Sequence, residues 1–493
     1  MPVMPERPRG PFAPREEYQA RTGSSYGLLP LRFLSLEDGR YLLTNLVGEH
    51  LVLPRSTLRQ LVGHQLPMNA TAYHDLKSKH FIMDGDSTVG LDLLAAKYRT
   101  KQSLLPNLTS LFMLVTTLRC DHACRYCQVS HRGQAEPGVD MSRATADHAI
   151  EFMFASPSPA IKVEFQGGES LLHFDLVKHI VEEAEKANED AGKDLQFVIA
   201  TNLSALSDGM LEFCSAHDIF ISTSLDGPRD LHNKNRPKIG GDSHEDVVRG
   251  IRRVREALGP YKVSALMTTT RESLSCPRQI VDEYVRQGFS SVFLRSLNPY
   301  GAAAGPGFVD DYSIEEWLVF YKEALAYIIE LNRGGLFFRE EFAALLLRKM
   351  LTPYPTGYVD LQSPAGIGIA GIVVNYDGTV YASDESRMLA EMGDKTFALG
   401  DVATDTYEDI IGSDKLHGIL AATMTEGMPE CHDCACQPYC GSDPVRHYRT
   451  QGDMVGFKPS SEFCKKTLGV TTHLVRLLQD DPGAADILAQ WAQ

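Results

Sequence analysis

Short apolar runs alternate with amphipathic stretches through the middle of this 493-residue chain. The runs have the length of buried strands, and the stretches between them repeat apolar residues at helical spacing. Strands that alternate with helices predict parallel βαβ units, so the fold class is α/β. Six units, two short of a complete barrel, predict an open, partial (β/α)6 barrel with its active site at the carboxyl ends of the strands. The strands are expected at 111–118, 161–165, 195–200, 219–225, 263–269 and 291–297, and helices at 142–154, 172–190, 244–258 and 277–287.

A different pattern precedes the barrel. Three short strands within residues 28–53, helices near 56–62 and 70–78, and a strand at 80–83 predict a small α+β N-terminal domain. This arrangement resembles a winged-helix-type module for docking a peptide, and a structural cap is the alternative.

After the barrel, residues 313–350 are expected to be helical, 372–381 to form a hairpin, and 465–490 to end the chain as a helix. These patterns divide the chain into a Pro-rich disordered tail, the α+β domain, the barrel, a helical linker and a C-terminal domain, at residues 1–19, 20–105, 106–310, 311–369 and 370–493.

Charge and cysteine content narrow the function. A formal net charge of −16 argues against general nucleic-acid binding, which needs a basic surface. We expect no membrane span, because no run of about 18 apolar residues occurs, and no secretory signal. Seven of the ten cysteines lie in two short segments. Clustered cysteines of this kind indicate metal ligands in the reducing cytoplasm rather than disulfides.

The first cysteine group directly follows the first barrel strand. Cys120, Cys124 and Cys127 have the spacing C-x3-C-x2-C, compact enough for one loop to surround one iron–sulfur cluster. Four irons normally need four ligands, so three cysteines leave one iron open to a cofactor or substrate. The alternatives are a zinc site completed by His122 or His131, or three unrelated core cysteines.

This spacing, with the aromatic Tyr126 before the last cysteine, resembles the signature of the radical S-adenosylmethionine (SAM) family. The resemblance implies a [4Fe–4S] cluster whose open iron binds SAM. Reductive cleavage of SAM then yields a 5′-deoxyadenosyl radical that abstracts a substrate hydrogen. Gln166-Gly167-Gly168-Glu169, at the end of the second strand, resembles the family's Gly-Gly-Glu motif. Its glycines let the backbone approach a ligand, and its carboxylate is expected to accept from the SAM ammonium group.

Two further strand ends fit the same family. Thr201-Asn202 follows the third strand, and Ser224-Leu225-Asp226-Gly227-Pro228 follows the fourth, with Arg236 shortly after. The resemblance implies that Ser224 and Arg236 hold the SAM carboxylate, whereas a plain turn is the alternative for 226–228. Arg295, at the sixth strand end, is expected to be an ordinary rim residue. The expected SAM contacts are Tyr126, Gly167, Gly168, Glu169, Asn202, Ser224, Asp226 and Arg236.

The second cysteine group resembles the SPASM extension, which carries auxiliary iron–sulfur clusters. Its expected ligands for one auxiliary [4Fe–4S] cluster are Cys431, Cys434, Cys440 and Cys464, with Cys436 as a spare or alternative ligand. The ligands of a further auxiliary cluster are largely missing, since the chain has 381–385 (YASDE) and Pro444 where cysteines are expected. Asp384 is a candidate non-cysteine ligand, a proton acceptor in catalysis, or a surface carboxylate. Cys214 and Cys276 are expected to be ordinary buried cysteines.

SPASM members mostly modify ribosomally made precursor peptides, which makes such a peptide the expected substrate. The N-terminal domain is expected to grip it by adding it as a strand to a sheet edge. Residues 117–127 and 383–388 further resemble a maturase of His-Xaa-Ser repeat peptide systems, which implies a second radical SAM protein as partner and an electron donor such as flavodoxin or ferredoxin. A sulfatase-type maturase that makes formylglycine and a non-catalytic iron–sulfur or zinc scaffold are the alternatives.

Overall fold

The computed structural model describes residues 26–85, 87–305, 308 and 312–493, so the tail expected at 1–19 lies outside the described residues. The chain divides into two compact units, Met1–Arg99 and Thr100–Gln493. The division falls within helix α3 (Val89–Lys101), close to the boundary expected at residue 105.

The first unit is a small α+β domain, as the sequence predicted. A three-stranded antiparallel sheet has the order β2-β3-β4, and β1 pairs antiparallel with β5. Its core is apolar and includes Leu43, Leu61, Leu76 and Phe81, all fully buried. The elements are β1 (Tyr26–Leu28), β2 (Leu31–Ser35), β3 (Arg40–Asn45), β4 (His50–Pro54), α1 (Arg55–Val62), α2 (Thr71–Ser78) and β5 (Ile82–Asp84).

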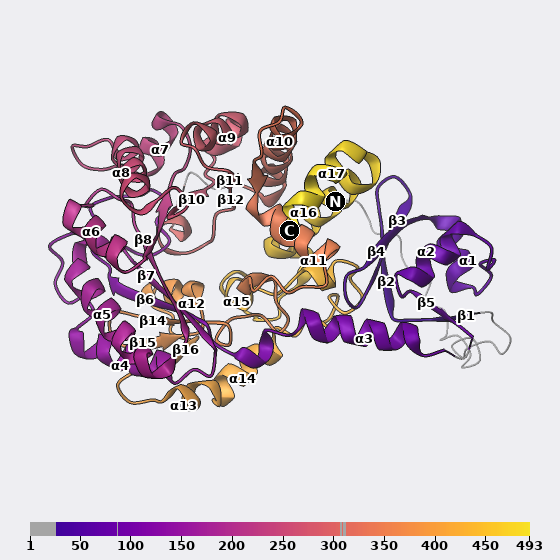
Figure 1. Cartoon of the computed structure of the whole chain (residues 1–493), viewed down its shortest axis with the longest axis horizontal. Coiled ribbons are helices and arrows are strands. Elements are labelled where there is room, and N and C mark those ends of the chain that lie inside the picture. Colours follow the sequence, from indigo (N-terminus) through magenta and orange to yellow (C-terminus); the bar gives the residue numbers. More distant parts are fainter. Residues whose placement is uncertain (1–25, 86, 306–307, 309–311) are drawn as a thin grey trace. The chain divides into compact units, whose positions relative to one another are not determined.

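The second unit contains the predicted partial barrel. Six parallel strands are joined in the order β12-β10-β9-β8-β7-β6, which confirms the six βα units. Figure 1 shows helices α4 to α9 along the outside of these strands. The six strands are β6 (Leu111–Thr117), β7 (Ala160–Gly167), β8 (Asp194–Ala200), β9 (Phe220–Ser224), β10 (Val263–Thr268) and β12 (Leu294–Arg295). The short strand β11 (Ser291–Val292) precedes β12 and belongs to a separate sheet. The helices are α4 (Arg143–Phe154), α5 (Phe174–Ala191), α6 (Asp208–Ala216), α7 (Arg229–Asn235), α8 (Ser243–Leu258) and α9 (Pro277–Arg286).

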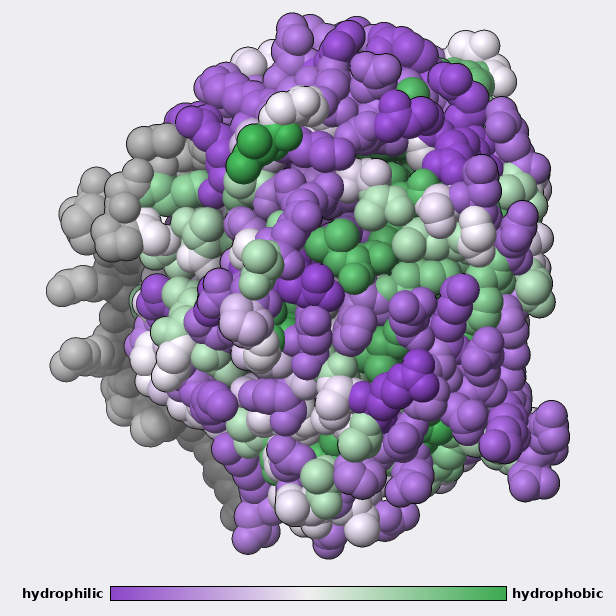
Figure 2. All heavy atoms as spheres, turned by 90° about the vertical axis from the view of Figure 1, so that its left-hand side faces the viewer, coloured by the Kyte–Doolittle hydropathy of each residue, from purple (hydrophilic) through white to green (hydrophobic). Residues whose placement is uncertain are grey.

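Alternation of buried and half-exposed residues explains why these segments form a layered barrel. In β7 the side chains of Ile161, Val163 and Phe165 are fully buried and the residues between them are not. Successive side chains of a strand point to opposite faces, so the buried side chains of β7 lie on one face of the sheet and the less buried ones on the other. On the side of the molecule seen in Figure 2, hydrophilic side chains predominate and hydrophobic ones gather near the middle.

The predicted hairpin extends the barrel sheet. β14 (Gly371–Val374) pairs in parallel with β6, and β15 (Thr379–Tyr381) and β16 (Ala398–Asp401) continue the sheet antiparallel. The boundaries expected near residues 310 and 369 therefore do not separate compact units. Periodicity identifies a strand but not its partner, so the pairing of β14 with β6 was not predictable from the local pattern.

The remaining elements are mostly helices. The helical stretch expected at 313–350 is α10 (Ile314–Arg333) and α11 (Glu341–Leu351), separated by β13 (Arg339–Glu340), which pairs with β11. The C-terminal helix is divided by Pro482 into α16 (Glu462–Asp480) and α17 (Pro482–Trp491). Between α11 and α16 lie α12 (Asp384–Glu391), α13 (Tyr407–Ile411), α14 (Asp414–Ala421) and α15 (Pro444–Gln451). Among the described residues, no helix has the length and apolar character needed to cross a membrane.

Candidate active site

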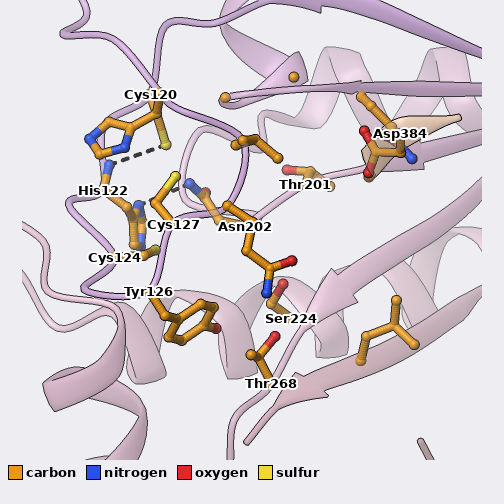
Figure 3. Close-up of a pocket in the computed structure, with 18 of the residues that line it drawn as sticks. Cys120, His122, Cys124, Tyr126, Cys127, Thr201, Asn202, Ser224, Thr268 and Asp384 are labelled. Carbon is orange, nitrogen blue, oxygen red and sulfur yellow. Dashed lines mark hydrogen bonds between the residues drawn. The ribbon is translucent and has the colours of Figure 1, made fainter. Parts of the chain in front are cut away.

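A cavity of about 250 Å³ lies at the carboxyl ends of the barrel strands. Figure 3 shows the three cysteines of the first group and Tyr126 on one side of this cavity, with Asp384 on another. We call it the main cavity. The expected site residues that line it are Cys120, Cys124, Tyr126, Cys127, Gly167, Gly168, Asn202, Ser224, Arg236 and Asp384.

Backbone hydrogen bonds fix the cysteine loop. The Cys120 N–H donates to the Arg132 carbonyl at 2.9 Å, and the Arg125 N–H donates to the Asn235 carbonyl at 3.0 Å. The His122 N–H donates to the Cys120 sulfur at 3.4 Å. The loop is therefore held at both ends before any ligand binds.

Burial controls the ionisation of the three thiols. It raises the pKa of Cys120 far above its usual value and that of Cys124 to about 12. Burial also opposes ionisation of Cys127, but hydrogen bonds from the His131 ring and backbone outweigh it and lower the pKa of that thiol. Three free thiols that face one cavity, those of the half-buried Cys120 and Cys124 and the buried Cys127, fit a metal cluster, whose positive charge would stabilise the thiolates.

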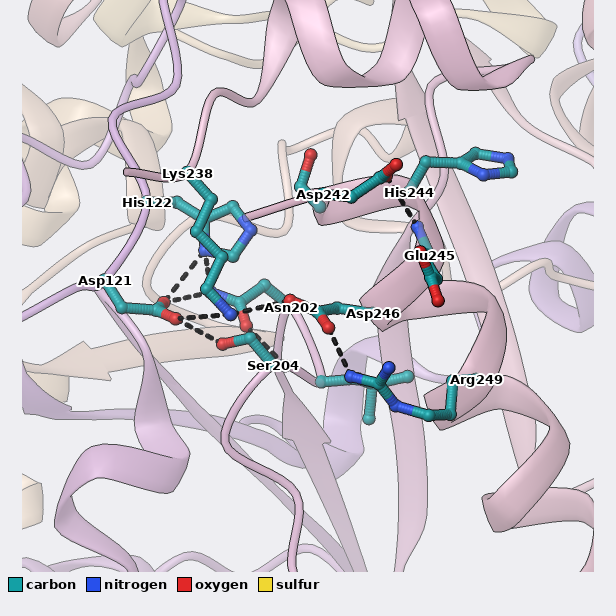
Figure 4. Close-up of polar contacts among 12 residues, drawn as sticks. Asp121, His122, Asn202, Ser204, Lys238, Asp242, His244, Glu245, Asp246 and Arg249 are labelled. Carbon is teal, nitrogen blue, oxygen red and sulfur yellow. Dashed lines mark hydrogen bonds and ion pairs between the residues drawn. The ribbon is translucent and has the colours of Figure 1, made fainter. Parts of the chain in front are cut away.

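An acidic side chain between the cysteines ties the loop to the barrel (Figure 4). The Asp121 carboxylate accepts from Asn202 Nδ2 at 2.8 Å and from the Ser204 hydroxyl, and contacts His122 Nδ1 at 2.8 Å. Lys238 Nζ lies 3.7 Å away. Burial opposes ionisation, yet these partners hold the pKa of Asp121 well below its usual range.

Removal of this acceptor is expected to loosen the cysteine loop. Asp121→Ala leaves the donors of Asn202 and Ser204 without their acceptor in a site where the Asp121 side chain is 10% exposed. We expect the free energy of unfolding of the iron-free protein to fall by about 2–3 kcal/mol, measured by denaturant titration. Asp190→Ala, at the exposed end of α5, is the matched control. An equal effect of both substitutions would contradict this role.

The two glycines of the Gly-Gly-Glu motif let strand β7 approach the cysteine loop. A Cβ on Gly167, whose φ is +145°, would lie 2.0 Å from the Thr117 carbonyl oxygen, and one on Gly168 would lie 2.4 Å from that of Arg119. Neither side chain fits, because these distances are far below van der Waals contact. The glycines therefore position the wall of the main cavity, in addition to any contact with a ligand.

Glu169 occupies a different place from the one expected. Its side chain is fully buried behind the cavity wall. The carboxylate accepts from the Thr201 hydroxyl at 2.6 Å, from the Asn202 N–H at 2.7 Å and from the Leu171 N–H at 3.0 Å. Glu169 thus orients the turn after β8, and its contact with an ammonium group stays a prediction.

Asp226 is likewise fully buried and orients two cavity residues. Its Oδ2 accepts from the Tyr126 hydroxyl at 2.7 Å and from Arg236 Nε at 3.1 Å. The Arg236 guanidinium also lies over the Tyr126 ring, 5.2 Å from its centroid. Burial opposes the Arg236 charge, but Asp226 outweighs this and raises the pKa of Arg236. A fixed positive charge therefore faces the main cavity beside the cysteines.

The second cysteine group also forms a spatial cluster. Burial raises the pKa of Cys440 to about 12 and that of Cys464 to about 11, and the charges of neighbouring cysteines add to both shifts. Cys436 is buried, and a hydrogen bond with Cys434 and burial raise its pKa well above the usual value. Lys458 is buried beside Cys431, Cys440 and Cys464. The set of thiols is chemically suited to an iron–sulfur cluster.

Several cavity residues had no predicted role. Arg295, expected on the rim, lines the main cavity, and so do Asn298 and Glu385. Asp384 lines it too, but its Oδ1 accepts from the buried Arg387 at 2.9 Å. Cys214 is buried as expected, whereas Cys276 is half-buried because it precedes helix α9 at the surface. Glu385 lies beside Asp384 in the sequence, but no local signal distinguishes the two carboxylates.

Comparisons with known proteins agree with this architecture. Residues 114–283 match the family model described as the radical SAM superfamily. The chain is 22% identical over 385 residues to a serine-type anaerobic sulfatase-maturating enzyme of Bacteroides thetaiotaomicron, covering 71% of this chain and 89% of that protein. It is 27% identical over 188 residues to an uncharacterized protein of Methanocaldococcus jannaschii, covering 38% of this chain and 62% of that protein, less than two thirds of its length.

Two solved structures share the fold. Native anSMEcpe with bound AdoMet superposes with a TM-score of 0.64 at 16% identity, covering 77% of this chain and 99% of that one. Streptococcus suis SuiB bound to precursor peptide SuiA superposes with a TM-score of 0.53 at 12% identity, covering 89% of this chain and 100% of that one. At these identities the likeness establishes the fold alone.

Proposed function

We propose that this chain, an enzyme of the radical SAM superfamily with its radical SAM domain at residues 114–283, modifies a ribosomally made precursor peptide by hydrogen abstraction. The observation that carries the proposal is the group of three free thiols, Cys120, Cys124 and Cys127, facing a 250 Å³ cavity at the ends of the barrel strands. These thiols would hold a [4Fe–4S] cluster, which would supply the electron for cleavage of SAM to the fragment that takes the substrate hydrogen.

The residues of the chain divide the remaining work. Ser224 and Arg236 hold the SAM carboxylate, since both line the main cavity and Asp226 fixes the guanidinium. Asn202 and the backbone at Gly167 and Gly168 complete that wall. The thiols of the second group, Cys431, Cys434, Cys440 and Cys464, hold one auxiliary [4Fe–4S] cluster, with Cys436 as an alternative ligand.

Two observations support a peptide substrate. The solved structures of similar fold include SuiB bound to a precursor peptide and anSMEcpe bound to a peptide. In the N-terminal unit, β2 is an edge strand that offers backbone donors and acceptors to an added strand. A second radical SAM protein and a flavodoxin or ferredoxin as electron donor are the partners we propose, in the reducing cytoplasm.

Co-expression tests this proposal. The neighbourhood of the gene is first searched for a short open reading frame that encodes a candidate precursor peptide. The chain is then produced anaerobically together with that peptide, and the peptide is analysed by mass spectrometry. We expect a loss of about two mass units per crosslink or oxidation, since one such event removes two hydrogens. The same peptide co-expressed with a Cys120/Cys124/Cys127→Ala variant is the control. If the peptide has the same mass after co-expression with the wild type and with the variant, crosslinking and oxidation are contradicted. Incorporation of deuterium from heavy water would then reveal an epimerisation.

A sulfatase-type maturase is the second candidate, favoured by the relatives and by the TM-score of 0.64 with anSMEcpe. Its test is an incubation with sulfatase-derived peptides that carry a central Ser or Cys. Formylglycine would be recognised by its reaction with a hydrazide. A product from these peptides, without any from the neighbouring precursor peptide, would replace the first proposal by the second.

A further inference from the structure

Two further cavities adjoin the main cavity, one smaller and one larger than it. An inner chamber of about 40 Å³ shares Arg295, Asn298 and Glu385 with the main cavity. An outer chamber of about 370 Å³ shares Ser296, Asn298 and Arg446 with the inner one. Neighbouring cavities share wall residues, so the three lie in a row, and we call the inner and outer chambers together the passage.

Charged and polar side chains stand among apolar ones in the wall of this passage. Arg446 Nη1 donates to Asn298 Oδ1 at 3.0 Å, and Arg446 also pairs with Glu462. The Glu462 side chain is 46% exposed and lines the outer chamber, so the passage reaches solvent there. The inner chamber exceeds the roughly 10–15 Å³ that one water molecule needs, and its walls offer several hydrogen-bond partners.

Glu385 stands where the main cavity meets the passage. In the part of the chain that the structure describes, it has no ion-pair partner, whereas the neighbouring Asp384 is paired with Arg387. Of the two adjacent carboxylates in the main cavity, Glu385 is therefore the one that can take up a proton without the loss of an ion pair.

We propose that Glu385 is the proton acceptor of the active site, and that the inner and outer chambers exchange its proton with solvent while substrate fills the main cavity. In this step an X–H bond of the substrate breaks and leaves its electron pair on the substrate. An O–H bond forms on Glu385, and the proton then passes to water. The inference rests on the proposed function, because it places the reacting substrate in the main cavity.

The electrostatic surroundings favour proton binding at this position. Burial raises the pKa of Glu385 to about 8, and the carboxylates of Asp360, Asp443 and Asp384 add to the shift. Other charged or titratable groups face it from the elements around the inner chamber: Arg295 at β12, Tyr358 and Asp360 before β14, Asp443 and Arg446 at α15, and Lys466 on α16. With a raised pKa the carboxyl is protonated at neutral pH, and its basic form grows as the pH rises through about 8.

Infrared spectroscopy of the purified protein tests the titration without any substrate. The C=O stretch of a protonated carboxylic acid is followed from pH 6 to pH 10 in the wild type, Glu385→Gln and Glu391→Gln. Glu391 lies on the same helix and lines none of the three cavities. We expect a band that disappears with a midpoint near pH 8 in the wild type and in Glu391→Gln, and that is missing from Glu385→Gln. The same titrating band in all three proteins would overturn the assignment.

Modification of the neighbouring precursor peptide tests the role in catalysis, with 5′-deoxyadenosine measured in the same samples. Below pH 8 the wild-type rate is expected to rise about tenfold per pH unit. Glu385→Gln should form product at least about tenfold more slowly at pH 8, and its rate should not rise with pH. Glu385→Asp should restore the rise of the rate with pH. Both variants should still form 5′-deoxyadenosine. Ser296→Leu, which narrows the junction of the two chambers, should slow product formation at pH 8 in the same way. If Glu385→Gln or Ser296→Leu shows the wild-type dependence of the rate on pH, the proposal is overturned. If the wild-type protein itself forms no 5′-deoxyadenosine, the proposed function is refuted instead.

Discussion

Replacement of Cys120, Cys124 and Cys127 by alanine is expected to abolish the formation of 5′-deoxyadenosine and to lower the iron content from about eight to about four per chain. The three thiols face one cavity, and alanine offers no ligand in their place. Iron is counted after anaerobic reconstitution, and 5′-deoxyadenosine is measured by chromatography after addition of SAM and dithionite.

The second cysteine group provides the reciprocal experiment. A Cys431/Cys434/Cys440→Ala variant should also lose about four irons but should still cleave SAM, because the first group is intact. Cys214→Ala, within the buried face of α6, serves as a control that changes neither quantity. Loss of SAM cleavage in the second variant, with its iron at about four, would contradict the separate roles of the two groups.

Removal of the Arg236 charge is expected to raise the Kd for SAM by about 10- to 100-fold, the effect of losing one charge-assisted hydrogen bond. Arg236→Met keeps the length of the side chain and leaves Asp226 with its hydrogen bond from Tyr126. Arg229→Met is the matched control, because Arg229 lies on the same helix region with a 64% exposed side chain and pairs with Asp242 outside the cavity. Binding is measured anaerobically on the reconstituted protein by calorimetry.

Two outcomes for Arg236→Met would distinguish a direct contact with SAM from an effect on the cysteine loop. If Arg236→Met binds SAM as tightly as wild type, the guanidinium does not hold the carboxylate. If SAM binding is lost together with iron, the substitution has disturbed the cysteine loop. The variant Asp226→Asn, which keeps the shape of the acceptor, then distinguishes an effect of charge from an effect of packing.

Hydrophobic periodicity was sufficient to predict the barrel. Each strand carries its own apolar run, and the helices between them fix parallel order, since short connections leave few alternatives. The motifs at Cys120, Gly167 and Ser224 fall at strand ends, and the strands converge, so these side chains meet at one cavity. A local pattern thus determined both the fold and the place of the site.

Contacts between distant segments were not predictable in this way. The pairing of β14 with β6, the turn of Glu169 away from the cavity and the position of Glu385 depend on packing between residues far apart in the sequence. Glu169 and Asp226 carry motif positions whose physical role is to orient their neighbours. A motif specifies the identity of a carboxylate but not the direction of its side chain, so the expected contacts of Glu169 and Asp226 with SAM stay predictions.

The most direct test of the central claim is the reaction of the reconstituted wild-type protein with SAM and dithionite under anaerobic conditions. The account predicts 5′-deoxyadenosine and methionine in equal amounts from a protein that contains about eight irons. A protein that binds zinc in place of iron and forms no 5′-deoxyadenosine would contradict it, and a non-catalytic scaffold would then be the better description of the chain.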